Sequence, residues 1–233
     1  MTLNEQIRDT IQQFRDTLPP ELAALIEQGA GEISALEIVE NALRVGDSAP
    51  DFALATYNGE SRTLESYLAQ GPLVLTFYRG AWCPYCNLQL AAYNARLDEI
   101  RETGANLVAI TPEQAEGADV FLDSDAPPSA KDSIVRAPNF DVLHDNANQL
   151  ARKYGLVFTL PQAHAKLFEL MNFEIEKATG DSSYTFPDPA TYIIDVDGII
   201  YWAFVPNNYR KRAEPDEIIK QLNTLKTHQE VSA

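Results

Sequence analysis

The chain has 233 residues, of which 45% are hydrophobic and 22% are charged, so it is long enough to bury a sizeable core and lacks the composition of a disordered protein. Its formal net charge of −16 repels phosphate backbones and anionic lipid surfaces, which excludes nucleic acid and membranes from the expected partners. The N-terminus has no basic stretch followed by an apolar run, and no segment approaches the roughly 18 apolar residues of a membrane span, so we expect a cytoplasmic protein.

Residues 1–44 have the apolar spacing of helices. Leu3, Ile7 and Ile11 recur at intervals of four, and the same kind of pattern continues to the end of the segment. Pro19–Pro20 and Gly29–Gly31 are expected to separate the helices, because proline and glycine both interrupt them. We therefore predict a helical N-terminal extension over residues 1–44 and a second domain over residues 45–233.

The second domain begins with a strand, a helix and a strand. Pro72–Tyr78 is an apolar, β-rich run of strand length. A helix is predicted to open near Pro84 and to end before Gly104. Asn106–Ile110 follows as a second buried strand. This order predicts a parallel βαβ unit with a right-handed crossover.

Further helices are predicted near residues 146–154 and 161–177. The strands Thr191–Asp195 and Ile199–Val205 should form an antiparallel hairpin, and Pro215–Leu225 should form a last amphipathic helix. This order of elements is that of a thioredoxin-like α/β fold, with a central mixed sheet flanked by helices. The segment 158–187 is then an insertion, which is a lid, a dimer surface or an ornament of the fold.

The only cysteines of the chain, Cys83 and Cys86, fall on the first turn of the predicted helix. Unpaired N–H groups and the helix dipole favour negative charge there, so the sulfur becomes a nucleophile near neutral pH. The spacing also brings the two sulfurs within disulfide reach, so one can resolve the product that the other forms. Pro84 suits the first helical position because its missing N–H has no role there.

Two other interpretations of the pair are a zinc site and two inert buried thiols. Zinc requires two further ligands, but His144, His164 and His228 are widely spaced and there is no second cysteine pair. The strand before the pair and the helix after it favour a redox motif. We therefore predict no metal and no cofactor.

Three segments, VGDSAPDFAL, FYRGAWCPYC and PATYIIDVDGIIYWAF, resemble the peroxiredoxin or AhpC/TSA family and occur in the same order. The resemblance covers about residues 45–225 and is closest to a subgroup with a helical N-terminal extension and the motif WCPYC. It implies a thioredoxin-like fold and a thiol peroxidase that reduces hydrogen peroxide or organic hydroperoxides. It also implies an external thiol reductant, such as a thioredoxin or glutathione system, and makes a homodimer a candidate assembly.

The sequence departs from the family motif, which has a proline, a threonine four residues later and the peroxidatic cysteine three residues after that. These positions hold Arg79, Cys83 and Cys86 here. The threonine that orients the peroxide is therefore absent, and Pro189 stands near the place of the arginine that supports the thiolate. Trp82 and the C-x-x-C pair instead resemble a thioredoxin active site, and Pro189 resembles the cis-proline that faces that site.

The two resemblances assign opposite roles to the sulfurs. Likeness to peroxiredoxins implies that Cys86 attacks peroxide and Cys83 resolves. Likeness to thioredoxin implies that Cys83, as the more exposed sulfur, attacks and Cys86 resolves. In both cases the only internal product is a Cys83–Cys86 disulfide.

Four residues are candidates for supporting roles: Arg79, Trp82, Pro84 and Pro189. Arg79 is either a cation that stabilises a thiolate or a surface arginine. Trp82 either shields the sulfurs and holds substrate or simply packs. His144 and His164 are left out of the site, because neither is near the motif and a lone histidine is more often structural.

The leading functional hypothesis is a peroxidase in which a thiolate attacks the O–O bond and the partner sulfur closes a disulfide. The first alternative is a disulfide reductase or electron carrier that acts on protein disulfides. The second is a binding or scaffold module whose residues 1–44 mediate dimer contacts.

Overall fold

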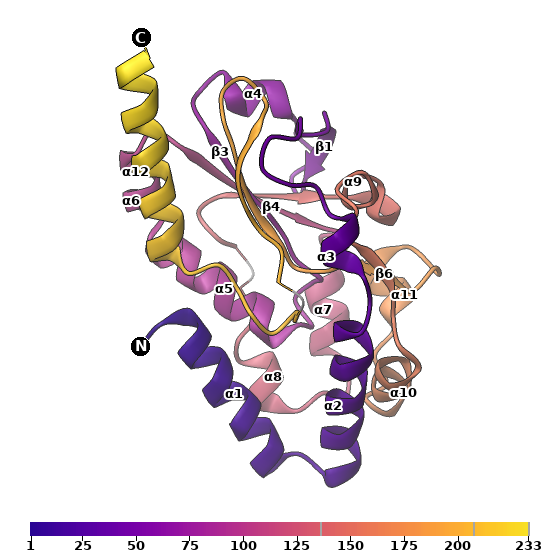
Figure 1. Ribbon diagram of the computed structural model, residues 1–233. Coiled ribbons are helices and arrows are strands. Elements are labelled where there is room, and N and C mark those ends of the chain that lie inside the picture. Colours follow the sequence, from indigo (N-terminus) through magenta and orange to yellow (C-terminus); the bar gives the residue numbers. More distant parts are fainter. Residues whose placement is uncertain (136, 207, 233) are drawn as a thin grey trace.

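The computed structural model describes residues 1–135, 137–206 and 208–232, and a mixed sheet lies at its centre (Figure 1). Within these residues the sheet has seven strands in the order β2-β1-β5-β4-β3-β8-β9. The strands are β1 (Ala53–Thr56), β2 (Ser61–Thr63), β3 (Leu73–Phe77), β4 (Asn106–Thr111), β5 (Asp141–His144), β8 (Thr191–Ile194) and β9 (Ile200–Phe204). The β3–β4 and β4–β5 pairs are parallel, whereas the β1–β2, β1–β5, β3–β8 and β8–β9 pairs are antiparallel.

Strand β3 leads directly to the cysteine pair. Every one of its residues is buried. Val74 belongs to one hydrophobic core, whereas Leu75 and Phe77 belong to the core on the other face. A strand covered on both faces has to be mostly apolar, which explains the run in the sequence, and its one polar side chain, Thr76, hydrogen-bonds Thr191. The predicted strand, βαβ unit and C-terminal hairpin are therefore confirmed, and so is the thioredoxin-like fold.

Helices cover both faces of the sheet. In Figure 1, α5 (Pro84–Ala95), α6 (Leu97–Glu102) and α12 (Pro215–Ser232) lie on one side, and α9 (Gln149–Lys153) lies on the other. Shorter elements complete the layers: α4 (Leu64–Leu68), α7 (Gly117–Leu122), α8 (Pro128–Lys131) and η1 (Asn146–Asn148). Among the described helices, none is long and apolar enough to cross a membrane.

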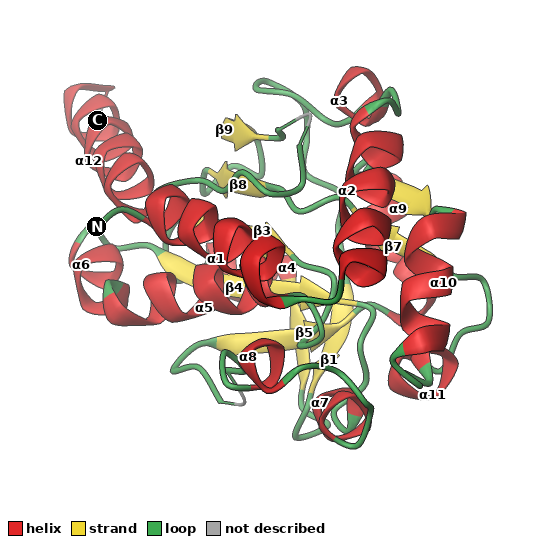
Figure 2. Cartoon of the chain, turned by 90° about the horizontal axis from the view of Figure 1, so that it is seen from below, coloured by secondary structure: helices red, strands yellow, loops and turns green. Residues whose placement is uncertain are grey.

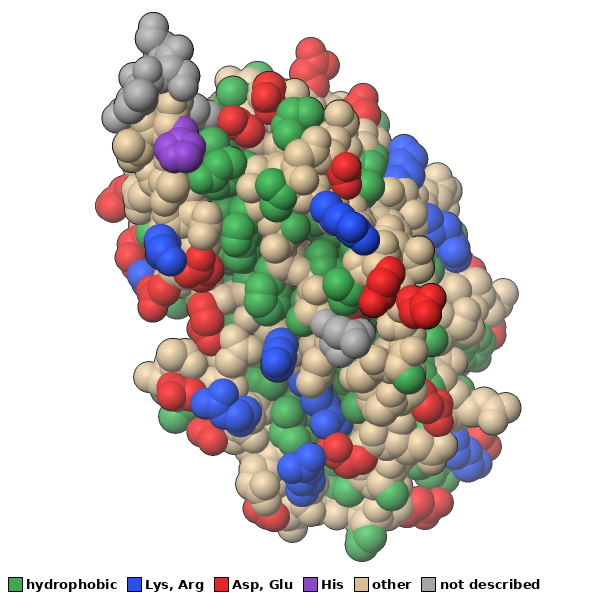
Figure 3. Space-filling model, viewed as in Figure 1, with side chains coloured by type: hydrophobic (Ala, Val, Ile, Leu, Met, Phe, Trp, Pro, Cys, Tyr) green, Lys and Arg blue, Asp and Glu red, His purple; other side chains and the backbone are tan. Residues whose placement is uncertain are grey.

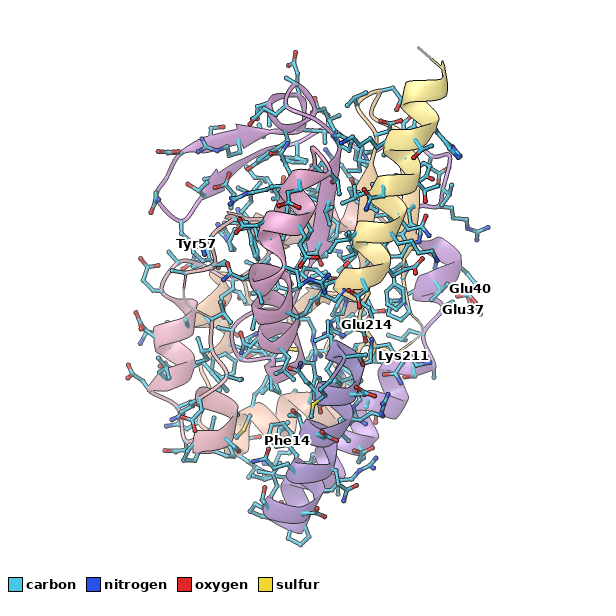
Figure 4. All side chains as sticks on the ribbon, turned by 90° about the vertical axis from the view of Figure 1, so that its left-hand side faces the viewer. Phe14, Glu37, Glu40, Tyr57, Lys211 and Glu214 are labelled. Atoms are coloured by element: carbon cyan, nitrogen blue, oxygen red, sulfur yellow. The ribbon has the colours of Figure 1, made fainter. Side chains whose placement is uncertain are left out.

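The N-terminal extension is helical, as predicted, and packs on the rest of the same chain. It consists of α1 (Leu3–Thr17), α2 (Pro20–Ser34) and α3 (Ile38–Asn41). Figure 2 shows α1 next to α5, and α2 next to α10 (Gln162–Leu170). Figure 4 shows Glu214 at the foot of α12, where its carboxylate accepts the backbone N–H groups of Leu3 at 2.9 Å and Asn4 at 2.8 Å. These two hydrogen bonds attach the first turn of α1 to the C-terminal part of the chain.

The glycines at residues 29–31 do not interrupt a helix, contrary to the prediction, because they lie inside α2. A Cβ at Gly29 would sit 2.3 Å from Cδ2 of His164 on α10. The absence of a Cβ at Gly29 therefore allows α2 and α10 to pack closely. The helix predicted to run from Pro84 to Gly104 is also wrong in one respect, because non-helical backbone at Arg96 divides it into α5 and α6.

The inserted segment has its own small sheet. Strands β6 (Val157–Thr159) and β7 (Thr185–Pro187) pair antiparallel and enclose α10 and α11 (Ile175–Thr179). The single helix predicted over residues 161–177 is thus two helices. The backbone of Asn172 adopts a positive φ of 49°, which a continuous helix does not allow.

The negative charge of the chain is unevenly distributed. On the face drawn in Figure 3, acidic side chains are scattered, whereas several Lys and Arg side chains gather in the lower half. A groove between α1 and β9 is lined by Arg8, Arg15, Arg210 and Lys211. Glu214 and Glu217 line the same groove, and Arg15 and Arg210 form ion pairs with Glu27, so the groove carries charges of both signs.

Candidate active site

The turn between β3 and α5 positions the cysteine pair. Gly80 has a φ of +143°, and a Cβ on it would sit 2.7 Å from Nε1 of Trp82. Only glycine allows the chain to turn this tightly there. Cys83 is the N-cap of α5, with extended backbone, and Pro84 is the first helical residue, as predicted. The backbone N–H groups of Cys86 and Asn87 donate to the carbonyl of Cys83, at 3.0 Å and 3.1 Å, and close the first turn.

The two sulfurs are in direct contact in the thiol form. Cys86 Sγ donates to Cys83 Sγ over 2.7 Å, and both cysteines are free. Both side chains have an exposed fraction of 0%. The expectation that Cys83 is the more exposed sulfur is therefore wrong, because both sulfurs are fully covered, and the buried side chains of Arg79 and Arg212 lie against them. A substrate must be small or must enter through a pocket.

Arg79 is a buried neighbour of Cys83 rather than a surface residue. Its Nη2 donates to Cys83 Sγ over 3.1 Å. The guanidinium lies 4.0 Å from the ring centre of Tyr209 and 4.9 Å from that of Trp82, and cation–π attraction holds it there. The cation that the sequence analysis considered beside the turn is therefore present.

The environment makes Cys83 the thiolate of the pair. Burial opposes ionisation, but the hydrogen bond from Cys86 and the positive charges of Arg79 and Arg212 hold the pKa of Cys83 well below its usual range. Burial raises the pKa of Cys86, and so does the bond in which it donates its proton to Cys83. The pKa values of the two sulfurs are thus shifted in opposite directions.

Arg212 is a site residue that the sequence analysis missed. It is buried in the loop between β9 and α12, and its Nη2 lies 3.4 Å from Cys86 Sγ. Its Nη1 donates to the carbonyls of Tyr209 and Lys211, which fix the guanidinium. The only signal in the sequence is the basic run Arg210–Arg212 in an acidic chain. Such a run does not indicate which of its side chains turns inward.

Two buried carboxyl groups near the pair were also missed. Burial raises the pKa of Glu113 to about 8, and its Oε2 accepts the N–H of Ala81 at 2.9 Å. Burial raises the pKa of Asp188 to about 7, and the positive charges of Arg212 and Arg79 oppose this shift. Both acids can therefore hold a proton close to neutral pH.

Two other predicted site residues, Trp82 and Pro189, do not hydrogen-bond either sulfur. Trp82 packs edge-on against Phe168 at 4.9 Å and Phe186 at 5.2 Å, so it closes the site from the side of the insertion. Pro189 is buried, but the peptide bond before it is trans, as are all peptide bonds among the described residues. The expected likeness to a cis-proline is therefore wrong.

His144 and His164, which were left out of the predicted site, lie on different elements of the fold. His144 lies on β5, whereas His164 lies on α10, 6.1 Å from Tyr209 between ring centres. In the described part of the chain, no group of three His, Cys, Asp or Glu residues is arranged to hold a metal ion.

Known proteins give the site a family context. The model of the AhpC/TSA family matches residues 45–203. Peroxiredoxin Bcp of Escherichia coli (strain K12) is 25% identical over 188 residues, which cover 81% of this chain and 99% of the relative. Chloroplastic Peroxiredoxin Q of Sedum lineare is 22% identical over 181 residues, which cover 78% of each chain.

Solved structures agree on the fold. The crystal structure of Peroxidoxin BcpB from Mycobacterium tuberculosis superposes with a TM-score of 0.54 at 21% identity and covers 78% of this chain and 98% of its own. Reduced 2-Cys peroxiredoxin from Plasmodium vivax gives a TM-score of 0.59 at 17% identity, with 81% and 84% coverage. Since the family model matches more than half of the sequence, the chain belongs to the AhpC/TSA family of thiol-dependent peroxidases with a thioredoxin-like fold.

Proposed function

We propose that the chain reduces peroxides with Cys83 as the attacking sulfur and Cys86 as the resolving sulfur. The observation that carries this assignment is the 3.1 Å contact between Arg79 Nη2 and Cys83 Sγ. A thiolate, not a thiol, attacks peroxide, and a neighbouring guanidinium stabilises the thiolate. The hydrogen bond from Cys86 adds to this stabilisation.

The proposed reaction balances with the two cysteines and one reductant. The thiolate of Cys83 attacks the terminal oxygen of ROOH, the O–O bond breaks, and Cys83 becomes a sulfenic acid. The leaving RO⁻ takes up a proton and departs as ROH. The sulfur of Cys86 then displaces the hydroxyl group from Cys83, which releases water and forms the Cys83–Cys86 disulfide.

This assignment differs from the position of the peroxidatic cysteine in the family motif, which falls on Cys86. The physical reason to favour Cys83 is that Cys86 is the proton donor of the sulfur pair and has the raised pKa. Burial also favours a small peroxide over a folded protein as the oxidant of the reduced pair, since neither sulfur is exposed, whereas the disulfide product has to become accessible to its reductant.

Rapid mixing of the reduced protein with hydrogen peroxide tests the assignment. We expect Cys83→Ser to remove the fast oxidation. We expect Cys86→Ser to keep the first step and to accumulate a sulfenic acid that dimedone traps. The reverse result, fast oxidation in Cys83→Ser and none in Cys86→Ser, contradicts the assignment. A wild-type rate no faster than that of a free thiol contradicts the peroxidase itself.

The proposal extends to partners and compartment. An internal disulfide has to be returned to two thiols, so an external thiol reductant such as a thioredoxin or glutathione system is needed, which suits a cytoplasmic location. A homodimer is proposed through the edge strand β9, where the half-buried rings of Trp202 and Phe204 stack at 6.2 Å. Sedimentation of the reduced protein tests it, and a monomer at all concentrations contradicts it.

A further inference from the structure

The loop of residues 208–214, which joins β9 to α12, brings two side chains to the active site. Arg212 donates from Nη2 to Cys86 Sγ over 3.4 Å. The ring centre of Tyr209 lies 4.0 Å from the guanidinium of Arg79. The guanidinium of Arg212 is held against its own loop, because Nη1 donates to two carbonyls of that loop. The position of the loop therefore sets the position of the charge beside Cys86.

A side chain from the opposite end of the sequence holds the backbone of Arg212. Asn4, in the first turn of α1, accepts the backbone N–H of Arg212 on Oδ1 at 3.0 Å and donates from Nδ2 to its carbonyl at 2.8 Å. One amide group thus pairs with both backbone polar groups of a single residue. Glu214 fixes this amide in turn, because its Oε1 accepts Nδ2 of Asn4 at 2.6 Å. In Figure 4, the labelled Lys211 and Glu214 of the loop lie beside the start of α1.

A second contact with the extension lies two residues earlier in the loop. Arg210 donates from Nη1 to Glu27 of α2 at 3.0 Å and from Nη2 to the carbonyl of Ile26 at 3.4 Å. From the main domain, Tyr93 of α5 donates to the carbonyl of Ala213 at 3.0 Å. Among the described residues, the extension makes more hydrogen bonds to this loop than the rest of the chain does.

We propose that Asn4 is a positioning residue of the active site, which holds Arg212 where its guanidinium assists closure of the disulfide. The contacts are continuous from the Asn4 amide to the Arg212 backbone and from the Arg212 guanidinium to the sulfur of Cys86. When Cys86 gives up its proton and attacks the sulfenic acid on Cys83, negative charge develops on its sulfur. A guanidinium within hydrogen-bond distance stabilises that charge. The effect of Asn4 on the reaction passes through Arg212.

The inference rests on the proposed function and gives the N-terminal extension a part in it. Asn4 and Arg212 both lie outside residues 45–203, which match the family model. The pairing therefore joins two segments that this model does not match, and both meet at the resolving sulfur. The redox step is unchanged: Cys86 displaces the hydroxyl group from Cys83, and water leaves.

The first test follows closure of the disulfide after a pulse of hydrogen peroxide, through the sulfenic acid that dimedone traps. We expect Asn4→Ala to slow closure about fivefold, since the loop then loses hydrogen bonds that place Arg212. Thr2→Ala is the control, because it removes the N-cap of the same helix and leaves the contact with Arg212 in place. Asn4→Leu, of similar volume, repeats the test if Asn4→Ala does not fold. Closure at the wild-type rate in a folded Asn4 variant, or equal slowing in Thr2→Ala, overturns the proposal.

The second test asks whether the effect of Asn4 passes through the Arg212 guanidinium. Arg212→Gln removes this guanidinium but keeps the backbone groups that Asn4 binds. The double variant, Asn4→Ala with Arg212→Gln, should therefore close the disulfide at the rate of Arg212→Gln alone. A double variant that is slower than Arg212→Gln by about the same fivefold factor means that the two residues act independently, which overturns the proposal.

The ultraviolet absorbance of the thiolate against pH gives a readout that needs no peroxide. The charge of Arg212 lowers the pKa of Cys83 and opposes the raised pKa of Cys86, so a displaced Arg212 raises the pKa of both thiols. We expect the titration curve of Asn4→Ala to shift to higher pH and that of Thr2→Ala to coincide with the wild type. An unshifted Asn4→Ala curve overturns the positioning role. A wild-type protein that peroxide oxidises no faster than a free thiol overturns the proposed function, whatever the titration shows, so the two failures are distinguishable.

Discussion

Arg79 Nη2 lies 3.1 Å from Cys83 Sγ, and both side chains are almost completely buried. A buried charge is costly unless it is paired, so each of these groups stabilises the charged form of the other. The rings of Tyr209 and Trp82 hold the guanidinium in place by cation–π attraction. Of the two cations at the site, the one that contacts Cys83 is therefore the one that the local sequence already places beside the turn.

Replacing that cation tests its role. We expect Arg79→Gln to raise the pKa of Cys83, because burial is then opposed only by the hydrogen bond from Cys86 and the charge of Arg212, and to slow oxidation by peroxide about tenfold or more. The ultraviolet absorbance of the thiolate, followed against pH, measures the pKa. Arg8→Gln removes an exposed charge and serves as the control, since the Arg8 side chain is 67% exposed. An unchanged titration curve in Arg79→Gln contradicts the role.

Arg212 should act on the second step. Cys86 must lose its proton to attack the sulfenic acid, and the Arg212 guanidinium at 3.4 Å favours the charge that then develops on Sγ. We expect Arg212→Gln to slow closure of the disulfide about tenfold, so that dimedone traps more sulfenic acid. Lys211→Gln removes the neighbouring exposed charge and should leave the trapped fraction at the wild-type level. Equal trapping in the two variants speaks against a role in resolution.

The sequence was sufficient for the parts of the site that are local. The apolar run of β3, the proline at the first helical position and the C-x-x-C spacing lie within fifteen residues, and each acts through neighbouring backbone. Arg79 falls in the same stretch, so it was found. Arg212 is 126 residues from Cys86 and meets it only after β9 turns back, which no spacing rule reveals.

The prediction for Gly29 was wrong for the same reason, and the place of His164 was equally hidden from the sequence. Gly29 was interpreted from its local preference as a helix break, but contact with His164 decides its use. His164 was set aside as a lone histidine, because its neighbours Tyr209 and Gly29 come from opposite ends of the chain. A residue whose role depends on contacts between distant segments gives no periodic signal.

The attachment of the extension can be weakened at a single point. Glu214 accepts N–H groups of the first turn of α1, so it satisfies donors that a helix start leaves open. We expect Glu214→Ala to lower the free energy of unfolding by about 1–2 kcal/mol and to speed hydrogen exchange in α1. Glu40→Ala, at an exposed site labelled in Figure 4, is the control. If exchange in α1 is unaffected by Glu214→Ala, the carboxylate does not hold the extension.

Glu113 should make the stability of the fold depend on pH. Burial raises the pKa of its carboxyl from 4.5 to about 8, so between these values the folded chain keeps a proton that the unfolded chain has lost. Stability therefore falls as the pH rises through this range and is constant above it. Glu113→Gln cannot titrate, and its amide oxygen can still accept the N–H of Ala81. We expect the variant to match the wild type near pH 4 and to exceed it by about 2–4 kcal/mol near pH 9, measured by urea unfolding. The exposed Glu116→Gln should leave the pH dependence as it is, and a Glu113→Gln curve parallel to the wild type rules out the buried proton.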